Sequence, residues 1–164
     1  MTNSELPISA FDIKEWRDRF IRVILRIASI LGIILIGVNY PTASLTDRIL
    51  FITLYLILLI VTLLPTPYML RAYLLLGSTA IIGINAIIAW GPWADGSLFF
   101  LATIVLASLL LDNRTDFIML AAAILSSTIL AVMDLQGAFQ LTAAGAPGTD
   151  LANWAVYIID FSIA

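Results

Sequence analysis

Long apolar runs recur along this chain of 164 residues, and short breaks rich in Pro, Gly or charged residues separate them. A helix needs about 20 mainly apolar residues, with a range of roughly 17–25, to cross the hydrocarbon core of a bilayer. Five runs approach that length, and a sixth ends before reaching it. The runs cover residues 20–40, 47–64, 72–90, 94–111, 116–133 and, incompletely, 153–164. The pattern predicts an all-α, polytopic transmembrane helix bundle with five full spans and a sixth that is truncated at the C-terminus.

The composition excludes a water-soluble fold of ordinary type. Hydrophobic residues make up 62% of the chain and charged residues 12%, and the mean hydropathy is +1.06. Soluble domains carry about 25% charged residues. The runs also lack the period-2 alternation of an outer-membrane barrel, and lipid satisfies no backbone polar groups, so the spans must be helices. We expect residues 1–19 to form a cytoplasmic tail with an amphipathic lead-in and residues 20–164 to form the bundle.

Two residue types are missing, and their absence narrows the function. The chain has no Cys and no His, which excludes a thiolate metal site, a catalytic thiol and an imidazole base. It contains no Gly-rich nucleotide-binding loop. We therefore expect no catalytic, cofactor-binding or metal-binding residues, no enzymatic activity in the chain itself and no nucleic-acid partner.

Basic residues are distributed unevenly among the breaks, and they predict the orientation in the membrane. Seven of the eight fall in the N-terminal flank and in the second and fourth breaks, which share one side. These seven are Lys14, Arg17, Arg19, Arg22, Arg26, Arg71 and Arg114. Because Lys and Arg concentrate on the cytoplasmic side, we expect a cytoplasmic N-terminus in a bacterial inner membrane, with the lipid bilayer as the principal partner.

The last apolar run ends abruptly. Residues 153–164 would form a helix of roughly 18 Å at 1.5 Å per residue, which cannot cross a core of about 30 Å. Either the natural chain continues, or this segment lies at or re-enters the outer face. We favour truncation, because a sixth span would return the chain to the cytoplasm, where a soluble domain could follow.

Four short motifs lie between the runs and at their ends. They are Leu64–Ala72 with its Pro-Tyr pair and Arg71, Ala94–Leu101 with Asp95-Gly96, Leu109–Arg114, and Asp150–Trp154 ending in Asn-Trp. Over about residues 15–164 they resemble the N-terminal multi-span input regions of bacterial sensor histidine kinases and related PAS or diguanylate cyclase signalling proteins, notably from green non-sulfur bacteria. One turn departs from the pattern, since Arg114-Thr115-Asp116 stands where Arg-Ala-Gly is common.

The resemblance implies a membrane-embedded sensory module of a two-component or related signalling protein. Such a module relays an external or membrane stimulus to a cytoplasmic output domain, which is not present here. It would form a homodimer through that domain, and its ligand is unknown. No transmitter domain is present, so ATP binding and phosphotransfer cannot be assigned to any residue of this chain. Two other functions stay open: a structural subunit of a membrane complex, and a small transporter half, although we see no inverted repeat.

Depth along the predicted helices suggests a site. Counted inward from the external ends at 1.5 Å per residue, five polar side chains lie at about 7–9 Å. These candidates are Asp160, Asn85, Thr53, Thr103 and Thr128. Polar groups inside a membrane are costly and often functional. We expect Asp160 and Asn85 to face each other, with the Thr hydroxyls nearby. They would form either a small external-facing polar pocket or a protonatable latch that alters the last helix.

Small residues in the first and third runs predict where helices approach closely. Gly32 and Gly37 lie in the first run, and Gly77 and Gly83 lie in the third. Small residues let membrane helices pack with their backbones close together. We therefore expect these glycines to serve packing rather than ligand binding.

Overall fold

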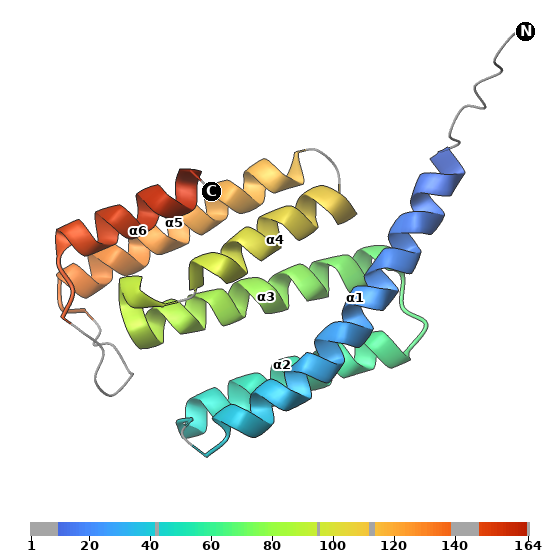
Figure 1. The fold of residues 1–164 in the computed structure, drawn as a ribbon, viewed down its shortest axis with the longest axis horizontal. Helices are drawn as coiled ribbons and strands as arrows, with labels where there is room; N and C mark the ends of the chain where they lie inside the picture. Colours follow the sequence, from blue (N-terminus) through green and yellow to red (C-terminus); the bar gives the residue numbers. More distant parts are fainter. Residues whose placement is uncertain (1–9, 42, 95, 112–113, 139–147, 164) are drawn as a thin grey trace, which may run out of the picture. The chain divides into compact units, whose positions relative to one another are not determined.

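The computed structural model describes residues 10–41, 43–94, 96–111, 114–138 and 148–163, and these residues form an all-α structure (Figure 1). The elements are α1 (Ala10–Asn39), α2 (Leu45–Leu63), α3 (Tyr68–Trp90), a short 3₁₀ turn η1 (Gly91–Trp93), α4 (Gly96–Leu110), α5 (Thr115–Leu135) and α6 (Leu151–Ile163). The chain divides into two compact units, residues 1–75 and 76–164, and α3 runs from the first into the second.

Within the residues that the structure describes, four helices are long and apolar enough to cross a membrane. The candidate spans are Glu15–Val38, Leu45–Leu63, Tyr68–Trp93 and Thr115–Leu135. The α4 helix has 15 residues, so it covers only about 22 Å. The predicted all-α fold with long apolar helices is therefore confirmed, whereas the predicted count of five full spans is not, because α4 runs only from Gly96 to Leu110.

The first unit is built on an antiparallel pair, α1 and α2, which lie side by side (Figure 1). A small residue allows the close approach, since a Cβ added at Gly32 would lie 3.1 Å from Cδ2 of Tyr55. Farther along, the hydroxyls of Ser29 and Thr62 form a hydrogen bond of 3.2 Å between the two helices. The prediction for Gly32 is confirmed, whereas a Cβ at Gly37 would meet nothing within 4 Å.

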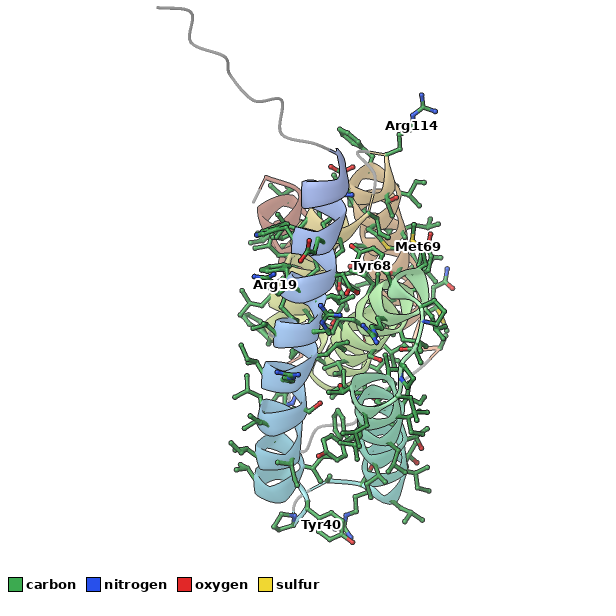
Figure 2. All side chains as sticks on the ribbon, turned by 90° about the vertical axis from the view of Figure 1, so that its right-hand side faces the viewer. Arg19, Tyr40, Tyr68, Met69 and Arg114 are labelled. Carbon is green, nitrogen blue, oxygen red and sulfur yellow. The ribbon has the colours of Figure 1, made fainter. Side chains whose placement is uncertain are left out.

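The turn between α1 and α2 is held by side chains. Ser44 caps α2: its Oγ accepts a hydrogen bond from the Asp47 amide at 3.1 Å, and its hydroxyl donates to the Asp47 carboxylate at 2.6 Å. The Arg48 guanidinium lies over the Tyr40 ring, 4.7 Å from its centroid, and its Nε donates to the Ala43 carbonyl at 3.0 Å. Tyr40 thus lies at the end of α1 that is remote from the charged stretch around Arg19 (Figure 2).

The charged N-terminal part of α1 continues into the first span without a break. Its buried face is formed by Ile21 and Leu25, which are one helical turn apart. By contrast, Trp16 and Val23 of the same helix are exposed, and the Trp16 ring stacks on the Phe20 ring with 5.1 Å between their centroids. One set of apolar side chains thus packs α1 inside the unit, and a second set stays exposed. An exposed apolar set is what a helix that enters the membrane interface needs for contact with lipid.

The second unit packs α4 against α5 and α5 against α6 (Figure 1). Close contact between α3 and the start of α4 depends on two glycines. A Cβ added at Gly96 would lie 2.7 Å from Cγ1 of Ile87 and 2.9 Å from the Gly83 carbonyl oxygen. A Cβ at Gly83 would lie 3.1 Å from Cβ of Phe99. The packing role predicted for Gly83 is confirmed, but Gly77 has open space around it.

The α5 helix reaches farther than its apolar run. The sequence predicts a break from Asp134, whereas the helix continues to Leu135. It ends in a Schellman motif: Gly137 has φ of +70°, its amide donates to the Asp134 carbonyl at 2.9 Å, and the Ala138 amide donates to the Met133 carbonyl at 2.8 Å. Asp134 therefore lies in the last turn of α5 and not in a loop.

Candidate functional site

A cavity of about 230 Å³ lies among α3, α4 and α5 of the second unit. Its lining comprises Ala80 and Ile84 of α3, Phe100 and Thr103 of α4, and Met119, Ala122, Ala123 and Ser126 of α5. Three of these residues are alanines, and their small side chains leave the space that larger apolar residues would fill. The cavity is partly open, and Ala122 on its wall is exposed.

The two hydroxyls on the wall bind their own helices. The Thr103 hydroxyl donates to the Phe99 carbonyl at 2.8 Å, and the Ser126 hydroxyl donates to the Ala123 carbonyl at 3.0 Å. Each hydroxyl has one proton to donate, and each proton is already used. The cavity therefore presents an apolar wall with two oxygens that can only accept, and no charged side chain lines it.

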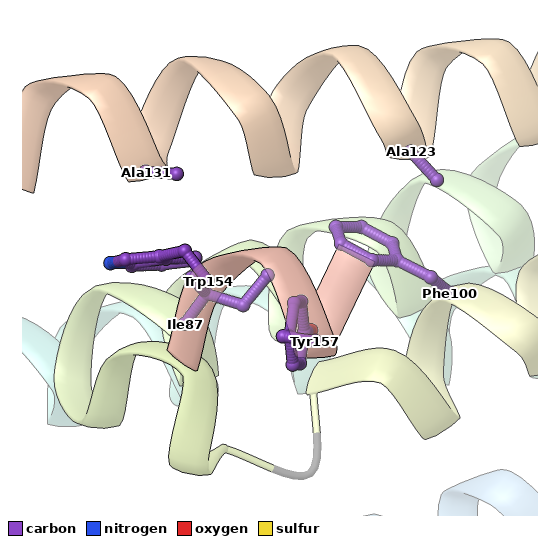
Figure 3. Close-up of a cluster of buried hydrophobic side chains, with 6 residues drawn as sticks. All are labelled: Ile87, Phe100, Ala123, Ala131, Trp154 and Tyr157. Atoms are coloured by element: carbon purple, nitrogen blue, oxygen red, sulfur yellow. The ribbon is translucent and has the colours of Figure 1, made fainter. Parts of the chain in front are cut away.

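A cluster of buried side chains adjoins the cavity. It joins Ile87, Phe100, Ala123 and Ala131 to Trp154 and Tyr157 of α6. Figure 3 shows the Trp154 and Tyr157 rings on α6, with the two alanines of α5 on one side and Phe100 of α4 beside them. The two α6 rings meet edge to face, with 6.0 Å between centroids. Phe100 and Ala123 belong both to this cluster and to the cavity wall.

The start of α6 is fixed to the end of α5 by a carboxylate. The Trp154 indole Nε1 donates to Oδ2 of Asp134 at 2.9 Å, and the Thr149 hydroxyl donates to the same oxygen. Trp154 is almost fully buried, at 1% exposure, so its N–H needs an acceptor inside the protein. Asp150 caps α6 by accepting from the Asn153 amide at 2.8 Å. The entry of the chain into α6 is therefore determined by two carboxylates.

In the first unit, an ion pair connects α1 to α3. Oδ1 of Asp18 lies 3.4 Å from Nη1 of Arg71, and Oδ2 of Asp18 contacts the Arg22 guanidinium. Arg71 also donates from Nε to the Thr66 hydroxyl at 3.1 Å. The Arg71 side chain is 12% exposed, against 73% for Arg19, which pairs with Glu15 on the surface. Asp18 thus holds the first turn of α3 against the charged stretch of α1.

The structure places four of the five side chains of the predicted polar pocket. Thr103 is buried and lines the cavity, and Asn85 is half-buried on α3. Thr128 is exposed on α5 and donates to the Ile124 carbonyl at 2.7 Å. Thr53 is exposed and belongs to the first unit. The side chain of Asp160 lies outside the described residues, so its pairing with Asn85 stays a prediction.

Neither the cavity nor the role of Asp134 is among the features predicted from the sequence. A signal existed for each. The alanines at 121–123 and Ser126 were visible as small residues on α5, and a Trp after a predicted external loop needs an acceptor for its N–H. Among the described residues, no group of three or more acidic side chains could hold a metal ion.

The comparison with known families agrees with the membrane helices and with the resemblance of the sequence to sensory input regions. The family MASE11 matches residues 15–164, which is most of the chain and the same stretch over which the resemblance extends. No curated protein matched the sequence, and no solved structure matched it either. MASE domains are membrane-associated sensory domains of signalling proteins. The chain therefore belongs to the MASE11 family of membrane-associated sensory domains.

Proposed function

We propose that this chain is the membrane-embedded sensory input module of a bacterial signal-transduction protein. It lies in the inner membrane and relays an external or membrane stimulus to a cytoplasmic output domain. Its membership of a membrane-associated sensory family carries the proposal. The motifs between the helices favour a histidine kinase of a two-component system as the output domain, with PAS or diguanylate cyclase domains as related outputs. The full protein would form a homodimer through its cytoplasmic output domain.

The side chains shared by the cavity and the α6 cluster supply a route for the signal. Phe100 and Ala123 line the cavity and also contact the cluster that seats Trp154 and Tyr157. Interiors are packed to near crystal density, so a displaced ring moves its neighbours. A change in the contents of the cavity would therefore alter how α6 packs, and α6 would carry that change toward the output domain.

A cytoplasmic N-terminus is supported by the distribution of basic residues and by the ion pair between α1 and α3. The Asp18–Arg71 contact keeps the N-terminal flank of α1 and the first turn of α3 at the same membrane face. Both segments belong to the side that carries seven of the eight basic residues. Positive charge marks the cytoplasmic side.

A hybrid receptor tests the proposal. Residues 1–164 are joined in frame to the cytoplasmic part of a histidine kinase with a measurable transcriptional output, with zero to four alanines inserted at the junction. If α6 relays a helix movement, basal output should vary with insertion length at a period near 3.6 residues, because each residue rotates a helix by about 100°. Output that does not depend on insertion length would contradict the relay.

A matched pair of variants locates the relay in the second unit. Phe100 is 3% exposed and belongs to the shared cluster, whereas Phe117 on α5 is 71% exposed. Phe100→Leu should change the basal output of the hybrid, and Phe117→Leu should leave it unchanged, at equal amounts of protein in the membrane. Equal outputs for the two variants would argue against the cluster as the relay.

A further inference from the structure

We infer that the cavity among α3, α4 and α5 binds a small, uncharged, mainly apolar molecule that enters from the hydrocarbon core of the membrane. The inference deepens the proposed function, because it names the class of ligand for the site assigned to sensing. Ligand binding by residues 1–164 can nevertheless be measured without an output domain. A failure of ligand binding can therefore be distinguished from a failure of the signal relay.

The size of the cavity indicates the size of the ligand. At about 230 Å³, it is larger than an apolar cavity of about 150 Å³ that holds benzene. It is smaller than the pockets of roughly 300–1,000 Å³ that take drug-sized ligands. A single ring with a short alkyl substituent, or a branched hydrocarbon of similar bulk, matches this space.

The wall chemistry sets the polarity of the ligand. A buried water needs two to four polar partners, and the wall offers only the oxygens of Thr103 and Ser126, whose protons are donated to helix carbonyls. A charged ligand would lie in an apolar wall without a counter-ion, which is strongly unfavourable. The favoured occupant is therefore a hydrocarbon-like molecule carrying at most one donor, which Thr103 Oγ1 would accept.

The depth of the cavity indicates the direction of entry. Thr103 is seven residues from each end of α4, which runs from Gly96 to Leu110. At 1.5 Å per residue it lies about 10 Å from either end. Ala122 and Ala123 likewise lie in the interior of α5, a candidate span. A ligand reaches this level through lipid, which also selects for uncharged, apolar molecules.

A methionine on the cavity wall provides a direct readout. The chain has four methionines, and Met119 lines the cavity, whereas Met69 and Met133 are exposed elsewhere. Residues 1–164, labelled with ¹³C at the methionine methyl groups and reconstituted in lipid nanodiscs, are titrated with toluene as the probe. The Met119 methyl signal should shift and saturate, while the Met69 and Met133 signals change only slightly and without saturation.

A filled cavity is the critical control. Ala122 lines the cavity, and its neighbour Ala121 is equally an exposed alanine of α5 that does not line it. Ala122→Leu should weaken toluene binding at Met119 at least tenfold, and Ala121→Leu should leave it within twofold. Ala80→Val narrows the cavity from α3 and serves as a second test. Unchanged chemical shifts of the Met69 and Met133 methyl groups verify that each variant is folded.

Two outcomes would overturn the inference. The first is toluene binding that does not involve the cavity. It would appear as a linear, unsaturated shift of all methyl signals, or as saturation that Ala122→Leu and Ala80→Val leave unchanged. The other is found with lipids that carry a nitroxide on the acyl chain. If these broaden Met119 more than Met133, and toluene does not reverse the broadening, a lipid chain occupies the cavity in place of a free small molecule.

Discussion

Gly96 lies where α4 begins beside α3, and the space for a side chain there is occupied by Ile87 and the Gly83 carbonyl. A methyl group at this position must push two helices apart. Overpacking of this kind costs about 1–3 kcal/mol. We expect Gly96→Ala to lower the free energy of unfolding by that amount, measured by denaturant titration in micelles. Gly77→Ala, which meets nothing within 4 Å, should be neutral or slightly stabilising, and equal losses for the two variants would contradict the close contact.

The buried hydrogen bond of Trp154 leads to a second prediction about stability. Its indole N–H donates to the Asp134 carboxylate from a buried position. Hydrogen bonds to charged groups contribute about 1.5–3 kcal/mol. Trp154→Phe should therefore destabilise the chain by about 2 kcal/mol or more, whereas Phe at the exposed Trp93 should cost little. The same denaturant titration compares them, and a Trp154 variant as stable as the Trp93 variant would show that the indole bond contributes nothing.

How much the sequence predicts at single positions depends on which face of a helix a residue occupies. Depth arithmetic places Thr53, Thr103 and Thr128 at one level, yet only Thr103 is buried. Rise per residue determines depth, but the direction of a side chain depends on which neighbour packs there, and a single sequence does not contain that information. The same reason separates Gly83, which contacts α4, from Gly77, which has open space.

Pairs of helices are connected by polar contacts as well as by apolar packing. Asp18 joins α1 to Arg71 at the start of α3, and Arg71 is largely shielded. Asp18→Asn leaves this guanidinium without its carboxylate and should cost about 1–2 kcal/mol. Glu15→Gln breaks the exposed pair with Arg19 and should cost at most about 0.5 kcal/mol.

A double-mutant cycle with Arg71→Gln measures the coupling between Asp18 and Arg71 directly. Additive losses in that cycle would show that the two side chains do not interact. A coupling comparable to the loss in Asp18→Asn would assign the stabilisation to the contact between α1 and α3.

Helix positions were predictable from the apolar runs, whereas helix ends were not. A run shows where lipid or core contact is possible, so all six helices match a predicted run. The ends depend on local hydrogen bonds: Ser44 caps α2, and Gly137 closes α5 beyond its apolar residues. The cavity was not predicted because it arises from alanines of two helices meeting across space, and no pattern along one chain segment contains that arrangement.

The orientation of the entire chain can be tested with reporters. Because seven of the eight basic residues lie on one side, a phosphatase or fluorescent fusion after Arg71 or Arg114 should report the cytoplasm. A fusion within residues 137–148 should report the exterior. Reversed signals at either place would contradict a cytoplasmic N-terminus, and mixed signals after Arg114 would contradict a full crossing by α4.

The shortness of α4 has a consequence for the lipids around the protein. At 1.5 Å per residue, α4 reaches about 22 Å, while α3 and α5 beside it reach more than about 30 Å. Tilting relieves the hydrophobic mismatch of a helix that is too long but worsens that of a helix that is too short, so mismatch at α4 favours a thinner bilayer around it. We expect thermal stability to rise when acyl chains are shortened from 18 to 14 carbons, as measured by light-scattering-detected unfolding in defined vesicles. Bilayer thickness would then itself be a physical quantity to which this helix bundle responds.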